Sequence, residues 1–178
     1  VIVPHVSNII GNILDIKFLK NQIKKINKNT KILVDGVAYM PHNIVNVNDM
    51  DVDFYVFSFY KLLGLRVSCL YIKNDMHSLH DLNIANQNHI FFNNESYNSE
   101  NKLQIGGINY ECLSSISGIK QYFMDFNNSF NNTSNNSNID SNSNVIYNSN
   151  RALLEKCFHN ISNYEYKITD KMNNFLMN

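Results

Sequence analysis

The sequence predicts an α/β layered protein with a partly parallel sheet. Short apolar, β-branched segments end in polar residues, and an amphipathic helical pattern separates the first two of them. A strand, a helix and a second strand in this order give neighbouring parallel strands joined by a crossover. The 178 residues suit roughly one domain or one part of a larger domain, and 44% hydrophobic residues suffice for a sizeable core.

Each element has its own signal. Apolar runs predict four strands, at residues 1–6, 31–35, 53–58 and 67–72. Residues 13–26 carry apolar side chains with lysines interspersed, which predicts an amphipathic helix. Helical spacing recurs at residues 110–126 despite Gly118, and a long helix is expected from Asn150 or Arg151 to about Phe175. Residues 73–102 are expected to be irregular.

Composition excludes several classes of function. Fifteen Lys and Arg balance fifteen Asp and Glu, so no basic field favours nucleic acid or an anionic membrane. No apolar run approaches the roughly 20 residues of a membrane-spanning helix. Cys69, Cys112 and Cys157 form no CxxC pair, which indicates free thiols in a reducing, intracellular compartment, cytoplasmic or organellar. Without an initiator Met or a signal peptide, the chain is expected to be an internal fragment.

Asparagine makes up about a fifth of the chain and is densest between residues 127 and 150, where it mixes with serine. Such a segment buries too little surface to offset its ordering entropy. We expect a disordered insertion at residues 127–150, with a binding segment as the alternative.

Polar residues follow three of the predicted strands at their carboxyl ends: Asn8, Asp35 and the turn from Ser58 to Lys61. Ligands of open α/β sheets bind at that edge, so these groups are expected to converge. A buried Asp35 would need a cationic partner. Lys61 could be that ion-pair partner, or it could be a reactive amine. An aspartate and a lysine amine at separate strand ends are what a pyridoxal phosphate site requires. A purely structural Asp/Lys pair remains the alternative.

Four sequence words carry a more specific signal. They are VSNIIG at residues 6–11, LVDGVAYMPH at 33–42, DFYVFSFYKLLG at 53–64 and GGINYE at 106–111. In order and separation they resemble the class V aminotransferase family, and more narrowly its cysteine desulfurase-like branch.

The resemblance implies a fold and a domain division. The fold would be part of the large domain of the PLP-dependent, aspartate aminotransferase-like transferases, an α/β architecture with a mixed, mostly parallel sheet and flanking helices. Residues 1–126 would form the C-terminal half of that pyridoxal phosphate-binding domain. Residues 151–178 would form a long helix leading toward a small C-terminal domain that is missing here.

Residue roles also follow from the resemblance. Lys61 would be the catalytic lysine and form the Schiff base with pyridoxal 5'-phosphate. Asp35 would pair with the pyridinium nitrogen and Asn8 would donate to the phenolic oxygen. Val37 would press on the ring, and Ser58 and Tyr60 would bind the phosphate. Gly106 and Gly107 would either reach a phosphate across a homodimer interface or form a turn.

The implied function is a PLP-dependent enzyme that acts on an amino acid, desulfurase-like or aminotransferase-like. Several departures leave a truncated or degenerate, non-catalytic member as the alternative. Tyr60 replaces a usual histidine, Ala38 a usual glutamine, and Leu65 and Arg66 a usual Pro-Thr. The catalytic cysteine of desulfurases would fall beyond residue 178. His5 and His42 are read as structural, and no metal site is expected because His77, His80 and His89 lack ligand spacing.

Overall fold

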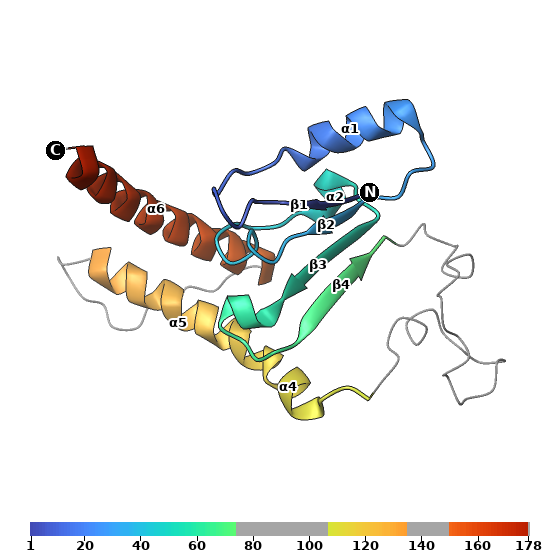
Figure 1. The fold of residues 1–178 in the computed structure, drawn as a ribbon. Coiled ribbons are helices and arrows are strands. Elements are labelled where there is room, and N and C mark those ends of the chain that lie inside the picture. The colour runs from blue at the N-terminus through green and yellow to red at the C-terminus, as the bar shows by residue number, and fades with distance from the viewer. Residues whose placement is uncertain (74–106, 135–149, 178) are drawn as a thin grey trace.

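The computed structural model describes residues 1–73, 107–134 and 150–177 (Figure 1). Strands and short helices alternate in the first part of the chain, and three helices follow. In chain order the elements are β1 (Ile2–Pro4), α1 (Ile16–Ile26), β2 (Leu33–Asp35), α2 (Val47–Met50), β3 (Phe54–Ser58), the 3₁₀ helix η1 (Phe59–Leu62), β4 (Ser68–Ile72), α4 (Tyr110–Ser114), α5 (Ile116–Ser134) and α6 (Asn150–Met177). Most of the segment expected to be irregular, residues 73–102, lies outside the described residues.

The four strands form one sheet in the order β1-β2-β3-β4. The first three are parallel, and β4 returns antiparallel to β3. In the register of the parallel strands, Pro4 lies opposite Asp35, and Asp35 lies opposite Val56. This confirms the predicted α/β architecture with a mixed, mostly parallel sheet. It also places the carboxyl ends of β1, β2 and β3 at one edge.

Helix α1 begins three residues later than the apolar pattern suggested. Asp15 is its N-cap, and the carboxylate accepts a hydrogen bond of 2.8 Å from the backbone N–H of Phe18. That bond satisfies one of the free donors at a helix start, which fixes the boundary. Ile13 instead forms an isolated bridge with Val6. The apolar pattern was therefore right about the helix and wrong about its first turn.

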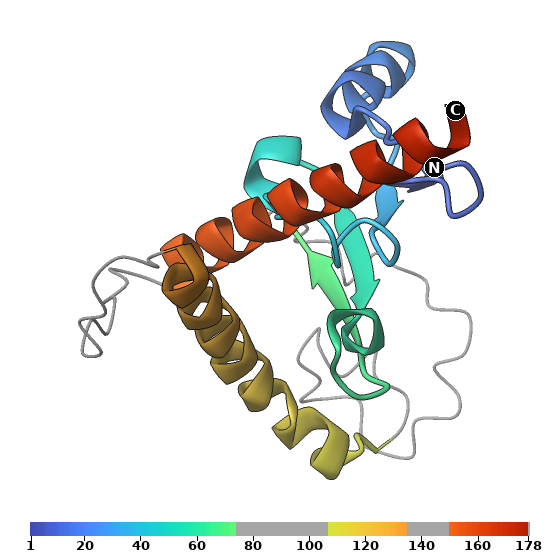
Figure 2. The same cartoon turned by 90° about the vertical axis from the view of Figure 1, so that its left-hand side faces the viewer.

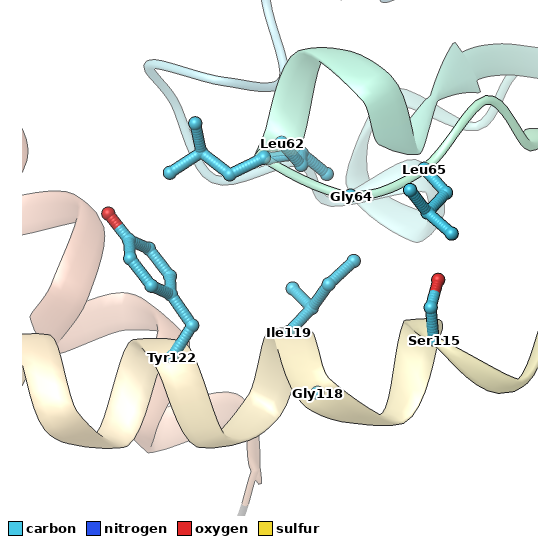
Figure 3. A pocket seen from close by; sticks show the side chains of 8 residues that line it. Leu62, Gly64, Leu65, Ser115, Gly118, Ile119 and Tyr122 are labelled. Atoms are coloured by element: carbon cyan, nitrogen blue, oxygen red, sulfur yellow. The ribbon is translucent and has the colours of Figure 1, made fainter. Parts of the chain in front are cut away.

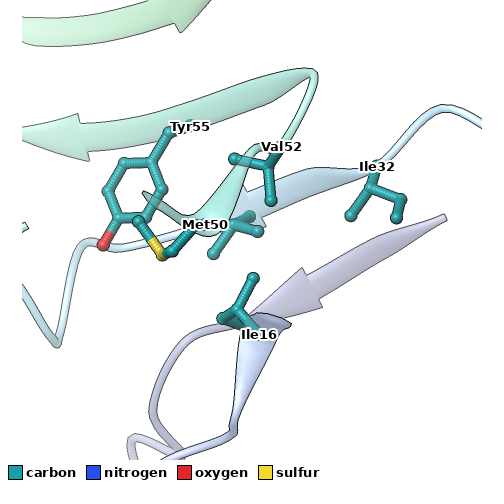
Figure 4. Packing of buried hydrophobic residues seen from close by; sticks show 6 residues of the cluster. Ile16, Ile32, Met50, Val52 and Tyr55 are labelled. Carbon is teal, nitrogen blue, oxygen red and sulfur yellow. The ribbon is translucent and has the colours of Figure 1, made fainter. Parts of the chain in front are cut away.

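The main core lies between the sheet and helices α1 and α2 (Figure 4). Its buried members are Ile16, Ile32, Val34, Met50, Val52 and Tyr55. Asp53 is the charged residue buried beside them, and its carboxylate accepts a 2.9 Å hydrogen bond from the backbone N–H of Ile32. Lys31 and Lys24 lie 3.3 and 3.7 Å from the same carboxylate. Paired in this way, a buried charge is tolerated.

Helices α5 and α6 pack against each other over a second cluster that reaches η1. Its buried members are Leu62, Phe123, Leu153, Cys157 and Phe158. Helix α6 confirms the long helix predicted from Asn150 or Arg151, and it runs to Met177. It crosses the side of the sheet on which the parallel strands end (Figures 1 and 2).

Two boundaries expected in this region are wrong. The predicted helix at residues 110–126 is divided at Ser115, where the hydroxyls of Ser114 and Ser115 donate to carbonyls in the preceding turn and compete with the helical pattern. Helix α5 then continues to Ser134, eight residues into the expected insertion at 127–150. The first residue of this extension, Asn127, is hydrogen-bonded to helix α6.

The Asn127 side chain is fully buried rather than part of a solvated polar tract. Its Nδ2 donates to the carbonyl of Leu153 over 3.2 Å, and its Oδ1 accepts from Nδ2 of Asn160 over 3.1 Å. Satisfied in this way, the amide joins α5 to α6 at little desolvation cost. Residues 135–149 of the expected insertion lie outside the described residues. No helix in the described parts of the chain is long and apolar enough to cross a membrane.

Candidate active site

Three segments follow the parallel strands and border the carboxyl edge of the sheet. After β1, the chain turns at Ser7, whose carbonyl accepts a 2.9 Å hydrogen bond from the N–H of Gly11. The Ser7 hydroxyl also accepts from the N–H groups of Ile9 and Ile10. Gly11 has φ +67, a left-handed conformation that glycine adopts without strain. This turn presents Asn8 at the edge.

Asp35 ends β2, and its exposed carboxylate caps the turn that follows. One oxygen, Oδ1, accepts a 2.9 Å hydrogen bond from the N–H of Val37. The expectation that Asp35 is buried is wrong, because its side chain is exposed, and no lysine or arginine in the described ranges forms an ion pair with it. At the open edge the carboxylate stays hydrated and bears no desolvation cost. Its second oxygen is available to a ligand.

Gly36 closes this turn against the strand beside it. Its N–H donates to the carbonyl of Val56 over 2.8 Å. A Cβ on Gly36 would overlap the hydroxyl of Tyr55. The position therefore requires glycine. The Tyr55 ring packs against the backbone next to Asp35 and restricts its movement.

Lys61 lies on η1, directly after β3. Leu63 ends this short helix with φ 64, and the N–H of Gly64 donates to the carbonyl of Phe59 over 2.8 Å. The Lys61 side chain is exposed. It makes no hydrogen bond or ion pair within the part of the chain that the structure describes. A lysine amine held on an ordered turn without a partner is available for chemistry.

An open pocket of about 720 Å³ brings part of the predicted set together. Asn8 and Lys61 both line it. Its other lining residues come from the turn after β1, the loop after β2 and helix α6: Val6, Ser7, Gly11, Ile13, Ala38, Pro41, His42, Asn43, Glu165 and Thr169. The pocket thus collects residues from four separate segments at the carboxyl edge, as open α/β sheets do for their ligands.

The other predicted binding residues do not line this pocket. Asp35 and Val37 lie in the adjoining turn, and Ser58 pairs with Ser68 at the end of β3. Tyr60 is exposed, with the Arg66 guanidinium 5.6 Å from its ring centre. A Cβ at Gly107 would meet none of the described atoms within 4 Å, and Gly106 lies outside the described residues. The structure describes no group of three or more His, Cys, Asp or Glu side chains that could hold a metal ion.

Sequence reasoning missed the contribution of helix α6. Glu165 and Thr169 line the pocket, and the Nδ1 atom of His42 lies 2.6 Å from Oε1 of Glu165. Nothing in the sequence marks Glu165, because it is one charged residue among many on a long helix and lies 123 positions from its partner. Only the tertiary fold reveals this contact.

His5, Tyr39 and Tyr55 form a polar cluster next to the carboxyl ends of the parallel strands. The His5 ring stacks on Tyr39 with ring centres 3.5 Å apart, and its Nδ1 lies 2.9 Å from the Tyr55 hydroxyl. Burial lowers the pKa of His5 to about 4, so the imidazole is neutral at physiological pH. Burial also raises the pKa of Tyr55, to which the nearby Tyr39 and Asp35 add. The structural role expected for His5 fits this position.

A second, apolar pocket of about 260 Å³ lies between the turn after η1 and helix α5 (Figure 3). Leu62, Leu65 and Ile119 line it. Gly64 approaches closely here, since a Cβ would stand 3.0 Å from Cδ1 of Ile119. Residues 65 and 66, which depart from the usual Pro-Thr, therefore lie beside a packing contact of η1 and outside the pocket that Lys61 lines.

The sequence matches the model of the aminotransferase class-V family over residues 1–109. The chain belongs to this family.

Two curated relatives match most of the chain. A cysteine desulfurase-like protein of Aspergillus flavus is 36% identical over 121 residues, which are 68% of this chain and 26% of the relative. An aminotransferase-like protein of Gibberella zeae is 33% identical over 119 residues, or 67% of this chain and 28% of the relative. The chain thus spans about a quarter of the length of these relatives.

Among solved structures, the cysteine desulfurase CsdA of Escherichia coli is 28% identical, with a TM-score of 0.39. The match covers 42% of this chain and 18% of the CsdA chain.

The residues at the edge fit pyridoxal phosphate, the cofactor that the resemblance implies. A free amine at Lys61 and an amide at Asn8 line one pocket, and the carboxylate of Asp35 keeps one oxygen open in the adjoining turn. An aldehyde, a phenolic oxygen and a pyridinium nitrogen are complementary to such an amine, amide and carboxylate. Ser58 adds a hydroxyl at the same edge.

Proposed function

We propose that this chain forms part of a pyridoxal phosphate enzyme that acts on an amino acid, desulfurase-like or aminotransferase-like, with Lys61 as its catalytic lysine. The observation that carries the proposal is the position of the Lys61 amine. It has no partner among the described residues, and it lines the same 720 Å³ pocket as Asn8 at the carboxyl edge of a mostly parallel sheet.

Each edge residue has a distinct task in this proposal. Asp35 binds the ring nitrogen through its free oxygen, while its other oxygen stays on the N–H of Val37 and holds the carboxylate in place. Asn8 donates to the phenolic oxygen, Val37 packs on the ring, and Ser58 and Tyr60 bind the phosphate. Pyridoxal phosphate, when bound, supplies an aldehyde for amines and an electron sink.

The chain's own acid–base group on the substrate is Lys61. The Lys61 amine lines the pocket and could accept the proton from the substrate α-carbon at Nζ. The same nitrogen can return this proton to another atom, which supports either transamination or elimination. Asp35, whose carboxylate the N–H of Val37 holds in place, would stabilise the ring nitrogen in its protonated form.

The proposal includes a homodimer in which Gly106 and Gly107 reach the phosphate of the partner. A Cβ at Gly107 would meet no described atom within 4 Å, which supports it, because a glycine backbone without a side chain can approach an anion closely. Exposed apolar side chains near Gly107, such as Ile108 and Tyr110, give the same region contact surface for a second copy.

The test is the visible absorption spectrum of the protein, expressed at the full length of its gene and titrated with pyridoxal phosphate. A Lys61→Ala variant removes the proposed amine. A Lys25→Ala variant, at an exposed lysine of helix α1, serves as the matched control because it removes the same charge at a residue that does not line the pocket.

We expect a visible band that saturates in the wild type and in Lys25→Ala and is lost in Lys61→Ala. A folded wild-type protein without a band, as judged by circular dichroism, would contradict the proposal. It would leave the non-catalytic alternative, in which the family fold serves another purpose. An equal band in Lys61→Ala would reject Lys61 as the cofactor lysine.

A further inference from the structure

The pocket that Lys61 lines has a second wall, which contributes an imidazole and a carboxylate. His42 comes from the loop after β2, and Glu165 and Thr169 come from successive turns of α6. The two titratable side chains meet, with 2.6 Å between Nδ1 of His42 and Oε1 of Glu165. Together with Lys61 they are the titratable residues that line this pocket.

The geometry of this contact determines what the imidazole can do. A hydrogen bond from Nδ1–H to a carboxylate fixes the tautomer and leaves the lone pair on Nε2. For Nε2 the structure records no partner in the described parts of the chain. A histidine oriented by a carboxylate in this way has the arrangement of a general base with its orienting group.

The reaction of an amino acid in this pocket needs such a base. A free amino acid carries its α-amino group as an ammonium ion at neutral pH, and an ammonium ion has no electron pair with which to attack a carbonyl carbon. Under the proposed function, Lys61 would be bonded to the cofactor when the substrate arrives, so its nitrogen would not be a free amine. The other nitrogen base that lines the pocket is His42, which is in contact with Glu165.

Resting on the proposed function, we propose that His42 is the catalytic base that activates the incoming amino acid and that Glu165 is its positioning residue. An N–H bond of the substrate ammonium breaks, its electron pair stays on the substrate nitrogen, and a new N–H bond forms at Nε2 of His42. Glu165 balances the resulting imidazolium. The His42 side chain is 56% exposed, so the proton passes on to water.

A merely structural role for His42 predicts a different outcome. Helix α6 contacts the same loop a second time, where the Arg151 guanidinium donates to the carbonyl of Val45 over 2.9 Å. If the His42–Glu165 contact served only to hold α6 against the loop, its loss and the loss of the Arg151–Val45 contact would change the reaction rate alike. Arg151→Gln is therefore the matched control, since it removes a contact between helix and loop outside the pocket.

The first measurement needs no cofactor. Nitrogen NMR of the protein at the full length of its gene, with labelled histidine, reports the tautomer of His42. We expect the Nδ1–H tautomer in the wild type and in Arg151→Gln, and a mixture of tautomers in Glu165→Gln. A wild-type His42 protonated on Nε2 in its neutral form would overturn the proposal.

The second measurement follows the visible band after rapid mixing with an amino acid, cysteine first, over a range of pH. His42→Gln should lower the second-order rate constant by about a hundredfold or more near neutral pH. The deficit should disappear above the pKa of the substrate amine, because the substrate then arrives deprotonated. Arg151→Gln should match the wild type at every pH, and the cofactor dissociation constant should be unchanged in both variants.

The outcomes distinguish a failure of the role proposed for His42 from a failure of the proposed pyridoxal phosphate function. A wild-type protein with no visible band overturns both. A wild-type band with a His42→Gln rate equal to the wild type overturns the role of His42 alone. A deficit that persists at high pH, or one that Arg151→Gln shares, overturns it as well and indicates that the contact only holds the helix.

Discussion

Nδ1 of His5 lies 2.9 Å from the hydroxyl of Tyr55, and both rings are buried beneath the turn that carries Asp35. The pair joins β1 to β3 across β2, whose last residue is the candidate carboxylate. Tyr39 stacks on the other side of the His5 ring. A neutral polar cluster of this kind fixes the strand ends without adding a charge near Asp35.

Tyr55→Phe should destabilise the protein. The ring still fills its space, but His5 loses its buried partner, and an unsatisfied buried polar group costs about 1–3 kcal/mol. Urea unfolding of the full-length protein measures the loss. The matched control is Tyr60→Phe at an exposed ring, which should change the free energy of unfolding by less than about 0.5 kcal/mol. Equal values for the two variants would contradict this account of the His5 cluster.

His5 should also make stability depend on pH. Its pKa is about 4 in the folded protein against 6.5 in an unfolded chain. Between these values the unfolded chain binds a proton that the folded chain does not, so the free energy of unfolding falls as pH is lowered from about 6.5 to about 4. Unfolding curves across this range should be less pH-dependent in His5→Gln than in the wild type. Parallel curves would show that folding does not lower the pKa of His5.

Gly36→Ala should disrupt the edge more than any exposed glycine-to-alanine change. The new Cβ would overlap the Tyr55 hydroxyl, so either the ring or the Asp35 turn must move. We expect a loss of about 1–3 kcal/mol and weaker cofactor binding. Gly118→Ala, at an exposed position of α5 where a Cβ meets open space, is the control. A Gly36→Ala protein with wild-type stability and binding would show that this packing has no consequence.

Two substitutions at Asp35 separate its charge from its hydrogen bond. Asp35→Asn can keep the bond to the N–H of Val37 through its amide oxygen, while Asp35→Ala cannot. Loss of the charged partner should weaken pyridoxal phosphate binding by roughly ten- to a hundredfold in both variants. Asp35→Ala should lose folding stability in addition, by about 1 kcal/mol. Titration of the visible band gives the dissociation constants, and an unchanged constant in Asp35→Asn would exclude Asp35 as the ring-nitrogen partner.

The sheet was predictable because each strand is a compact apolar run that ends at a turn residue. The edge residues Asn8 and Lys61 were found from the sequence for the same reason, since polar residues that follow parallel strands share one edge. The environment of Asp35 was not predictable. Apolar neighbours in the sequence suggested a buried carboxylate, whereas the strand ends at an exposed turn.

Long-range polar contacts escaped prediction entirely. Asn127 looked like the start of a solvated tract, yet it is buried by a helix that begins 23 residues later. The His42–Glu165 contact joins a loop to a helix that is distant in the sequence, and Glu165 does not stand out from its local pattern. Such contacts depend on how the elements pack, which local composition does not encode.

The most direct test of the central claim is peptide mapping after borohydride reduction. Reduction of the protein in the presence of pyridoxal phosphate should convert a bond at Lys61 into a stable attachment, and mass spectrometry of the digested chain locates it. We expect the added mass on the peptide that contains Lys61, at stoichiometric yield. Attachment at another lysine, or a low yield spread over surface lysines, would contradict the assignment of Lys61 and with it the proposed function.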